Sequence, residues 1–384
     1  MKKLLAIILI LMLIISQTAC GTNNNGGAGG SAGTGTSTAT GHNAPTEGTS
    51  FGEDWLLDTY CYIKIFQGSR EDLIKDAFAY ARELEGELSR TMEGSAVSRF
   101  NDAGATTGFS VFDSSAQNMV QVLSSALDFA DMTDGLFDPT IGAVTPLWDF
   151  ASENPELPDS EKIAEALTHV GYDKIVSDAD GKINKAEDEV KIDLGAIAKG
   201  YIADRVAEYL KTEDINGAII SLGGNIVLIG QKPDGKNWAV GIEKPFSGEG
   251  EKLEERESVG TVKWSGTEMN ADSKEDTFSV VTSGTYERCF KKDGVWYHHV
   301  LDPATGYPVD TDLVSVTITG NSSCYCDALS TCCLLMGSKD AAAFMESFNK
   351  EHTGEPNGIG TYEYVFIKKD GSIIASADAN FTKK

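Results

Sequence analysis

Basic residues are scarce in this chain. It has 384 residues, with 32 Lys and Arg against 58 Asp and Glu, which gives a formal net charge of −26. Binding a nucleic-acid backbone requires a basic stripe that displaces counterions, and a polybasic membrane-surface protein requires a similar cluster, so the charge balance argues against both classes. Hydrophobic residues make up 41% and aromatic residues 9%, far more than a disordered polyelectrolyte contains. The composition therefore indicates a folded protein.

Long apolar runs are also missing, apart from one near the N-terminus. Two lysines precede an unbroken apolar run from Leu4 to Ile15, which is too short for a stop-transfer helix and is typical of a secretory signal. Cys20 follows small residues at the expected cleavage point, a layout that resembles a bacterial lipobox, although Gln17 replaces its usual aliphatic residue. We expect residues 1–20 to be a lipoprotein signal peptide with Cys20 as the lipidation site. Ordinary secretion, with Cys20 removed or unmodified, is the alternative.

Residues 21–50 are mostly Gly, Ser, Thr, Asn and Ala. Such a segment buries too little apolar surface to offset its ordering entropy, so we predict a disordered tether. The body of the protein is then residues 51–384. Signal, tether and body together predict a domain held by a lipid anchor at the extracytoplasmic face of the bacterial cell membrane, or a periplasmic one.

Regular alternation of strands and helices is absent from this body, which argues against a doubly wound sheet. Apolar residues at helical spacing predict helices at 70–90, 115–132, 160–170 and from Gly195 to about Leu210. A β-like run at 59–66 precedes these helices, and further short β-like runs lie at 190–193, 218–222, 226–229, 238–242, 278–282, 313–319 and 362–367. Helices come early and strands cluster later, so we predict an α+β fold. The charged stretch 245–277 is predicted to be a surface insertion.

Two stretches combine glycine with groups suited to phosphate. After Asp193, the turn-forming Gly195 opens a predicted helix whose free N–H groups and Lys199 suit an anionic phosphate, although Asp193 could simply cap that helix. In the stretch 221–225, the paired glycines Gly223 and Gly224 would let a ligand approach the backbone closely, or would form a plain hairpin turn.

Two further stretches carry acid/base and metal-binding residue types. His298 and His299 stand side by side before an Asp-Pro turn, where a histidine suits acid/base work or phosphate contact but could equally hold the turn. Asp327 and Thr331 are four residues apart at the start of an apolar helix, so their oxygens lie on one face. Hard oxygen ligands favour Mg²⁺, while a helix cap plus a buried threonine is the alternative.

In their order along the chain, these stretches resemble the ApbE family, the FAD:protein FMN transferases. The resemblance rests on 193–201, 221–225, 283–288, 298–308 and 327–331, together with 135–140 and 146–148, and covers nearly all of the body. It implies an ApbE-like fold with antiparallel-rich sheets, packed helices and an FAD cleft between two halves. It also implies a Mg²⁺-dependent transfer of FMN from FAD, the substrate, to a Thr or Ser hydroxyl of an acceptor flavoprotein, with release of AMP.

The resemblance assigns roles to individual residues. The metal ligands would be Asp327, Thr331 and the backbone carbonyl of Ala196, with Ser330 as a weaker candidate. The residues that hold FAD would be Leu57, Leu136, Phe137, Asp138, Asp193, Lys199, Ser283, Gly284, His299 and Leu301. His299 and Asp327 are the expected catalytic residues, and His298 is expected to be structural. The expected acceptor is a membrane-linked redox subunit.

Alternatives to the transferase remain open. The same metal would let water replace the acceptor hydroxyl, which gives an FAD pyrophosphatase that forms FMN and AMP. A flavin-binding or transporter-feeding lipoprotein without catalysis would share the anchor and the tether. Among the six cysteines of the body, Cys332 and Cys333 lie in the apolar helix and are expected to be buried free thiols, while a zinc site from Cys324, Cys326 and the histidine pair lacks the usual spacing.

Overall fold

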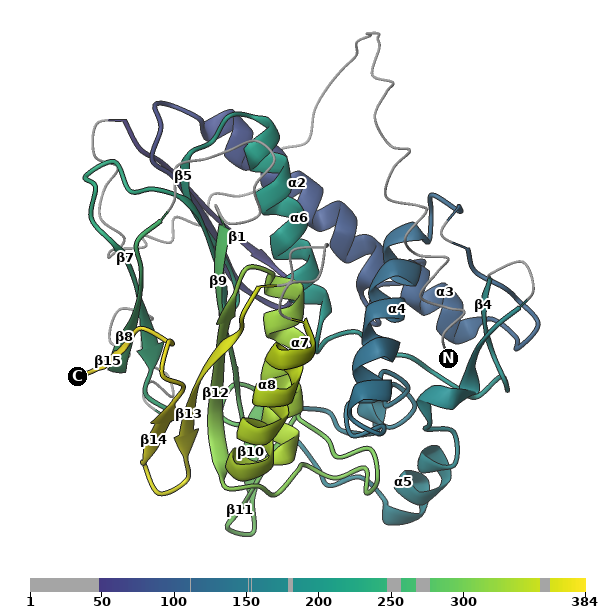
Figure 1. Ribbon diagram of the computed structural model, residues 1–384. Coiled ribbons are helices and arrows are strands. Elements are labelled where there is room, and N and C mark those ends of the chain that lie inside the picture. The colour runs from purple at the N-terminus through teal and green to yellow at the C-terminus, as the bar shows by residue number, and fades with distance from the viewer. Residues whose placement is uncertain are drawn as a thin grey trace, which may run out of the picture. The chain divides into compact units, whose positions relative to one another are not determined.

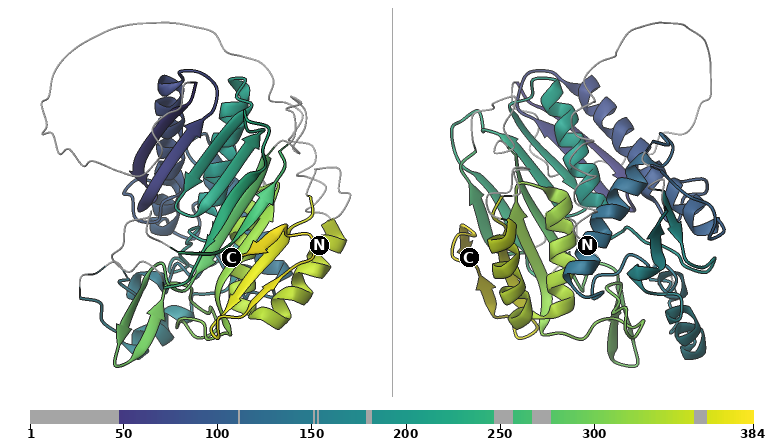
Figure 2. Two further views of the ribbon diagram at one scale, coloured as in Figure 1. Left: turned by 90° about the vertical axis from the view of Figure 1, so that its left-hand side faces the viewer. Right: turned by 45° about the vertical axis from the view of Figure 1, so that its right-hand side comes forward.

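A computed structural model describes residues 48–110, 112–150, 152, 154–178, 182–246, 257–266, 277–352 and 360–384. Its centre is an eight-stranded sheet in which neighbouring strands are antiparallel. Across the sheet the strands are β1 (Ser50–Leu56), β2 (Thr59–Ile65), β5 (Gly217–Leu222), β6 (Asn225–Gly230), β9 (Thr277–Gly284), β12 (Leu313–Gly320), β13 (Glu363–Lys368) and β14 (Ile373–Ala375). Spatial order thus follows chain order, as the colours in the left view of Figure 2 show.

Both faces of this sheet are covered. Side chains on one face, such as Ile220 and Val316, enter the main core, while Leu228 and Val314 enter a second core on the opposite face. The second core is closed by a three-stranded sheet of β15 (Phe381–Lys383), β8 (Ser258–Trp264) and β7 (Trp238–Glu243). Because side chains alternate between two covered faces, the central strands are buried on both sides, and every residue of β12 is buried.

Helices pack on the face that carries the main core (Figure 1). They are α2 (Glu71–Leu88), α3 (Ala96–Asp102), α4 (Gln117–Met132), α6 (Ala198–Thr212), α7 (Ser323–Met336) and α8 (Ser338–His352), while α5 (Ser160–Leu167) lies apart from the sheet in a separate core. Helix α7 is buried on nearly all sides and contacts α6, α8, β9 and β12. It ends at Gly337, whose φ of 79° suits a residue without a side chain.

Smaller elements surround the ends of these helices. Two hairpins are formed by β3 (Ile175–Ser177) with β4 (Ile183–Lys185) and by β10 (Cys289–Lys292) with β11 (Val295–His298), and two 3₁₀ turns are η2 (Thr145–Leu147) and η3 (Tyr172–Lys174). A third core gathers around Trp148, whose Nε1–H donates to the carbonyl of Gly306 at 2.8 Å. It joins α5 to the loop that follows β11.

The predicted α+β fold with antiparallel-rich sheets is confirmed, and the helices predicted at 70–90, 115–132 and 160–170 correspond to α2, α4 and α5. The strand predicted at 190–193 is wrong, since Lys191 forms only an isolated bridge to Ile141. The surface insertion predicted at 245–277 is wrong for Ser258–Trp264, because β8 pairs with β7 and buries Val262. The sheet begins at Ser50, one residue before the predicted start of the body.

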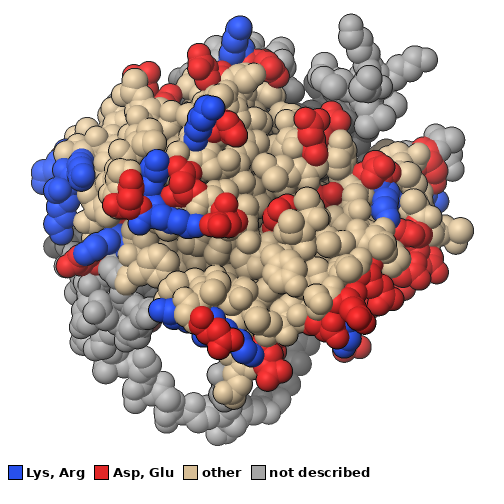
Figure 3. All heavy atoms as spheres, turned by 90° about the horizontal axis from the view of Figure 1, so that it is seen from below, with Lys and Arg blue, Asp and Glu red and all other residues tan. Residues whose placement is uncertain are grey.

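Several predictions lie outside the described residues, namely the signal peptide, Cys20, most of the tether and the most charged part of 245–277. In the part of the chain that the structure describes, no helix is both long enough and apolar enough to cross a bilayer. The acidic excess is unevenly distributed. On the face in Figure 3, Asp and Glu side chains gather toward the right-hand side.

Candidate active site at the junction of α6 and α7

The predicted metal and phosphate residues meet where α6 begins and α7 passes beside it. The carboxylate of Asp327 is 2% exposed, and its Oδ2 accepts a hydrogen bond from the backbone N–H of Gly200 at 2.9 Å. Its Oδ1 lies 3.4 Å from Nζ of Lys199. Two stretches that are more than a hundred residues apart in the chain thus lie in contact here.

Gly200 permits this close approach. A Cβ at this position would lie 2.2 Å from the carbonyl oxygen of Ser323, a backbone atom that has little freedom to move. The N–H of Gly200, which a regular helix would direct to the carbonyl of Ala196, donates to Asp327 instead. Among the described residues, no donor reaches the Ala196 carbonyl, so this oxygen is available to a ligand.

Hydroxyl groups extend the site along α7. Ser283 on β9 lies with its Oγ 2.6 Å from Oγ of Ser330 and 3.5 Å from Oγ1 of Thr331. Ser330 also donates to the carbonyl of Asp327 at 2.8 Å, and it is fully buried. Thr331 is only partly buried and makes longer contacts, which leaves its oxygen better placed for a ligand than that of Ser330.

The two neighbouring histidines differ in their surroundings. His298 is buried and its Nε2 lies 3.2 Å from the carbonyl oxygen of Val309, so it holds the loop that follows β11. Nδ1 of His299 is inaccessible to solvent and has no hydrogen-bond partner among the described residues. Burial, followed by the positive charges of Arg288 and Lys199, lowers the pKa of His299 to about 3. His299 is therefore a neutral imidazole at neutral pH and lies near Lys199.

Two predicted FAD-binding carboxylates are engaged with the protein. Asp193 pairs with Nε of Arg90 at 3.0 Å and accepts the N–H of Gly195 at 2.9 Å, which shapes the turn before α6. Asp138 accepts hydrogen bonds from its own loop and from the chain after α5. These donors are Thr140 N at 2.8 Å, Thr140 Oγ1 at 2.6 Å and Tyr172 N at 2.8 Å. Both acids thus organise the loops that border the site.

The predicted apolar contacts to FAD are spread around these loops. Leu57 has a positive φ of 58° in the β1–β2 turn, where its N–H donates to Glu85 at 2.8 Å. Phe137 is buried against Phe129, while Leu136 is partly buried beside it. Leu301 is buried in the third core with Trp148. A Cβ on Gly284 would lie 2.5 Å from the ring of Tyr286, so this glycine makes room for a ring of the protein.

The glycine pair of the stretch 221–225 forms the turn between β5 and β6. Gly223 and Gly224 have φ values of 58° and 94°, and a Cβ on Gly223 would lie 2.2 Å from Cγ2 of Thr59. The close approach at this turn is thus made by another part of the protein. The hairpin explanation accounts for both glycines.

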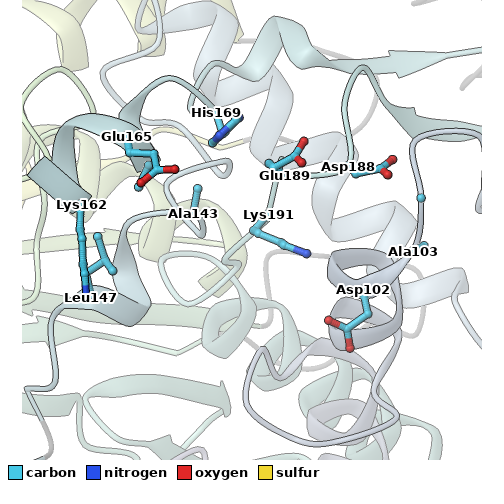
Figure 4. A pocket seen from close by; sticks show the side chains of 12 residues that line it. Asp102, Ala103, Ala143, Leu147, Lys162, Glu165, His169, Asp188, Glu189 and Lys191 are labelled. Carbon is cyan, nitrogen blue, oxygen red and sulfur yellow. The ribbon is translucent and has the colours of Figure 1, made fainter.

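A hollow of about 660 Å³ lies elsewhere and touches none of the predicted site residues. Figure 4 shows that charged side chains of both signs surround it, with Lys162 and Lys191 beside several acids. His169, Glu187 and Glu189 lie at this hollow or next to it, with donor atoms within 4.8 Å of one another. Glu187 already pairs with Lys174 at 2.6 Å, and its Oε1 lies 3.3 Å from Nδ1 of His169.

The six cysteines of the body are free thiols, as expected for Cys332 and Cys333. Cys324 and Cys326 are buried in α7, and among the described residues neither belongs to a group that could hold a metal. Burial raises the pKa of both thiols well above the ordinary value. They pack as small apolar groups.

The sequence analysis missed one polar residue next to the site. Asp204 on α6 is partly buried, and its carboxylate accepts hydrogen bonds from the start of α7. Desolvation raises the pKa of Asp204 to about 6, although the hydrogen bonds oppose that shift. Its spacing of four residues from Gly200 places both residues on the same face of α6. This spacing indicates a role for Asp204 only once the structure shows that α7 packs against that face.

Comparisons with known proteins agree with this geometry. A model of the ApbE family matches residues 57–353. An FAD:protein FMN transferase of Treponema pallidum is 32% identical over 76% of this chain and 80% of its own length, and one of Klebsiella pneumoniae is 30% identical over 84% and 90%.

Solved structures agree as well. The crystal structure of an ApbE protein from Thermotoga maritima has a TM-score of 0.70 at 29% identity, and the flavin transferase ApbE from Vibrio cholerae has a TM-score of 0.68 at 26% identity. Each match covers 86% of this chain and 97% of the other protein. The chain therefore belongs to the ApbE family.

Proposed function

We propose that this protein is an FAD:protein FMN transferase that moves FMN from FAD to a Thr or Ser hydroxyl of a partner redox protein and releases AMP. The observation that carries the proposal is the contact of Asp327 on α7 with Gly200 and Lys199 at the start of α6. Thr331 lies one turn further along α7, and His299, whose pKa is lowered mainly by burial, is close enough to Lys199 for that charge to lower it further. The proposal is supported by curated relatives with that activity in their names.

The atoms of the reaction balance without any further reactant. The acceptor oxygen forms a bond to the phosphorus of the FMN half of FAD, and the bond from that phosphorus to the bridging oxygen breaks. AMP leaves with the bridging oxygen, and the hydroxyl proton passes to a base or to water. Such a transfer depends on positioning and charge neutralisation.

The donor set at the junction fits Mg²⁺. Asp327 offers a carboxylate, Thr331 a hydroxyl and Ala196 a carbonyl that has no donor among the described residues, and all three are the hard oxygens that Mg²⁺ prefers. Ser330 is a weaker candidate because Ser283 and the Asp327 carbonyl already engage its hydroxyl. When bound, Mg²⁺ would neutralise charge on the diphosphate and on the departing AMP.

The side chains of the site supply the remaining functions. Lys199 places an ammonium beside Asp327, where it can bind a diphosphate oxygen. His299 is neutral at neutral pH, so its ring can orient the acceptor hydroxyl or accept its proton, and an anionic diphosphate nearby would raise the pKa of the ring. Arg90 and Gly195 hold Asp193 at the turn before α6, beside the expected FAD.

The test uses the purified protein with FAD, Mg²⁺ and candidate acceptors from membrane-linked redox complexes. We expect the mass of one acceptor to increase by one FMN, with an equal amount of AMP released. Free FMN and AMP without any mass increase, across all acceptors, would favour the pyrophosphatase. If neither FMN transfer nor AMP release is detected, both activities are contradicted and a flavin-binding protein remains.

We also propose that the protein is anchored by a lipid on Cys20 at the extracytoplasmic face of the cell membrane. The supporting features are the apolar run, the small residues before Cys20 and the polar segment after it. Membrane fractionation of cells that make the natural chain or Cys20→Ser tests this. The natural chain should sediment with membranes and the variant should not, while equal sedimentation would contradict the anchor.

A further inference from the structure

Helix α7 is tied to α6 at two points, only one of which belongs to the proposed metal site. The first is the hydrogen bond from the N–H of Gly200 to Asp327. The second is the carboxylate of Asp204, one turn later on α6. It accepts hydrogen bonds from Ser322 Oγ at 2.8 Å, Ser323 N at 2.7 Å and Cys324 N at 2.9 Å.

These two points fix the register of the helices. Gly200 and Asp204 are four residues apart on α6, and their partners Asp327 and Ser323 are four residues apart on α7 in the opposite order. One point of contact alone would leave α7 able to tilt or rotate about it. Two contacts that are one helical turn apart oppose both movements.

Asp204 does more than cap α7. Ser322 is already the N-cap, since its Oγ accepts a hydrogen bond from the N–H of Tyr325. In the described part of the chain, no Lys or Arg forms an ion pair with Asp204, so only N–H and O–H groups compensate its charge. A partly buried carboxylate without a cation costs stability, which a structural cap alone does not require.

The geometry of the proposed metal site depends on this register. Ala196 precedes α6, while Asp327 and Thr331 belong to α7, so the three oxygens have a fixed relation only while the helices keep their relative position. Mg²⁺ requires near-octahedral geometry with bonds of about 2.0–2.1 Å, so shifts of a few tenths of an ångström weaken binding. We propose that Asp204 is a positioning residue that holds the Mg²⁺ ligands of α6 and α7 in register. The inference rests on the proposed function.

The experiment compares Asp204→Asn with Asp312→Asn. Asp312 also accepts hydrogen bonds at a helix start, with Oδ1 accepting Ser338 N at 2.8 Å and Oδ2 accepting Ser338 Oγ at 2.6 Å, but it lies at the opposite end of α7 and pairs with Lys368 at 3.0 Å. Binding of Mn²⁺ alone, without nucleotide, is titrated by electron paramagnetic resonance. The Mg²⁺ concentration for half-maximal FAD turnover is measured in parallel.

We expect Asp204→Asn to weaken Mn²⁺ binding and to raise the half-saturating Mg²⁺ concentration by about 10–100-fold, with kcat recovered at saturating Mg²⁺. Asp312→Asn should keep the natural affinity. A purely structural role for Asp204 would lower the fraction of folded protein, and hence the number of Mn²⁺ sites, without changing the affinity of each site.

A second pair of variants guards against a failure of Asp204→Asn to fold. Gly200→Ala places a Cβ 2.2 Å from the Ser323 carbonyl oxygen and must displace α7, whereas Gly86→Ala in α2 meets no atom within 4 Å. Gly200→Ala should weaken Mn²⁺ binding as Asp204→Asn does, and Gly86→Ala should not. Ser322→Ala removes one donor to Asp204 and should give a smaller change in the same direction.

The outcomes separate the two proposals. Natural Mn²⁺ affinity in Asp204→Asn, or an equal loss in Asp312→Asn, overturns the positioning role while the metal site stands, provided that Asp327→Ala abolishes Mn²⁺ binding. If Asp327→Ala binds Mn²⁺ as the natural protein does, the metal site itself is wrong and the positioning role falls with it.

Discussion

The ammonium of Lys199 and the carboxylate of Asp327 lie 3.4 Å apart, but their side chains are exposed to different degrees, 28% and 2%. The lysine therefore forms the solvent side of the pair, and the carboxylate lies beneath it. An anionic diphosphate that approaches from solvent reaches the ammonium before it reaches the carboxylate. This arrangement separates the expected effects of changing the two residues.

Replacing Lys199 should weaken FAD binding. A charge-assisted hydrogen bond contributes about 1.5–3 kcal/mol, so we expect Lys199→Met to raise the FAD dissociation constant roughly 10–100-fold. Equilibrium titration of FAD fluorescence measures this. Lys211→Met, at the other end of α6, is the control. Unchanged FAD affinity in Lys199→Met would show that the ammonium serves only Asp327.

Replacing Asp327 should abolish turnover. We expect Asp327→Ala to lose both FMN transfer and FAD hydrolysis, since both need the same metal ligand, and to lose the hydrogen bond from Gly200. Asp340→Ala, an exposed acid in the first turn of α8, should keep full activity. Release of AMP from FAD is the common readout for both reactions. Full turnover by Asp327→Ala would refute the metal assignment.

The two histidines should behave differently when replaced. General acid–base catalysis contributes roughly 10²–10⁴-fold, so we expect His299→Gln to lower kcat for FMN transfer within that range. His298→Gln should change kcat much less, because His298 holds the carbonyl of Val309. Single-turnover transfer at saturating FAD and acceptor measures kcat directly. Equal losses in both variants would assign the effect to the loop instead of to the ring of His299.

How much of this was predictable from sequence depends on how local each feature is. The apolar stripe of α2 repeats at helical spacing and predicts the helix directly, because burial of that stripe is what stabilises it. The run Val190 to Ile192 also alternates, and the side chains of Val190 and Ile192 are buried. It forms no strand, because its only β-type pairing in the described residues is the isolated bridge of Lys191 to Ile141. Alternation predicts which side chains are buried and does not by itself supply a partner strand.

The residues of the candidate site could not be predicted as a group from local sequence patterns. Asp193, His299 and Asp327 could be grouped only through the family resemblance, since no spacing rule brings such distant residues together. Asp204 could not be predicted from the sequence, because it accepts hydrogen bonds from backbone N–H groups of a helix more than a hundred residues later. Lys199 was predicted as a phosphate ligand, but its contact with Asp327 depends on how α6 meets α7.

Stability should fall in mild acid because of His298. Burial lowers the pKa of this residue from 6.5 to about 4. Between these values the unfolded chain binds a proton that the folded protein does not, so the free energy of unfolding decreases as pH falls, by at most about 1.4 kcal/mol per pH unit. Urea unfolding of the natural protein and of His298→Gln at pH 7 and pH 4.5 should show the smaller loss in the variant. Asp204, with its raised pKa, has the opposite slope, and His299, with its lowered pKa, has the same slope, but both are common to the two proteins. Equal losses would contradict the prediction.

Asp138 allows a last distinction, between a residue that contacts FAD and one that holds the loop around it. Its carboxylate accepts hydrogen bonds from Thr140 and Tyr172, so Asp138→Ala leaves buried N–H groups without a partner. We expect a loss of about 1–3 kcal/mol in the free energy of unfolding, together with weaker FAD binding, because the loop carrying Leu136 and Phe137 loosens. Urea unfolding and FAD titration measure the two effects, and the exposed Asp131 gives a control variant, Asp131→Ala, in the preceding helix. Lost FAD binding with unchanged stability would mean that the Asp138 carboxylate acts on the nucleotide itself.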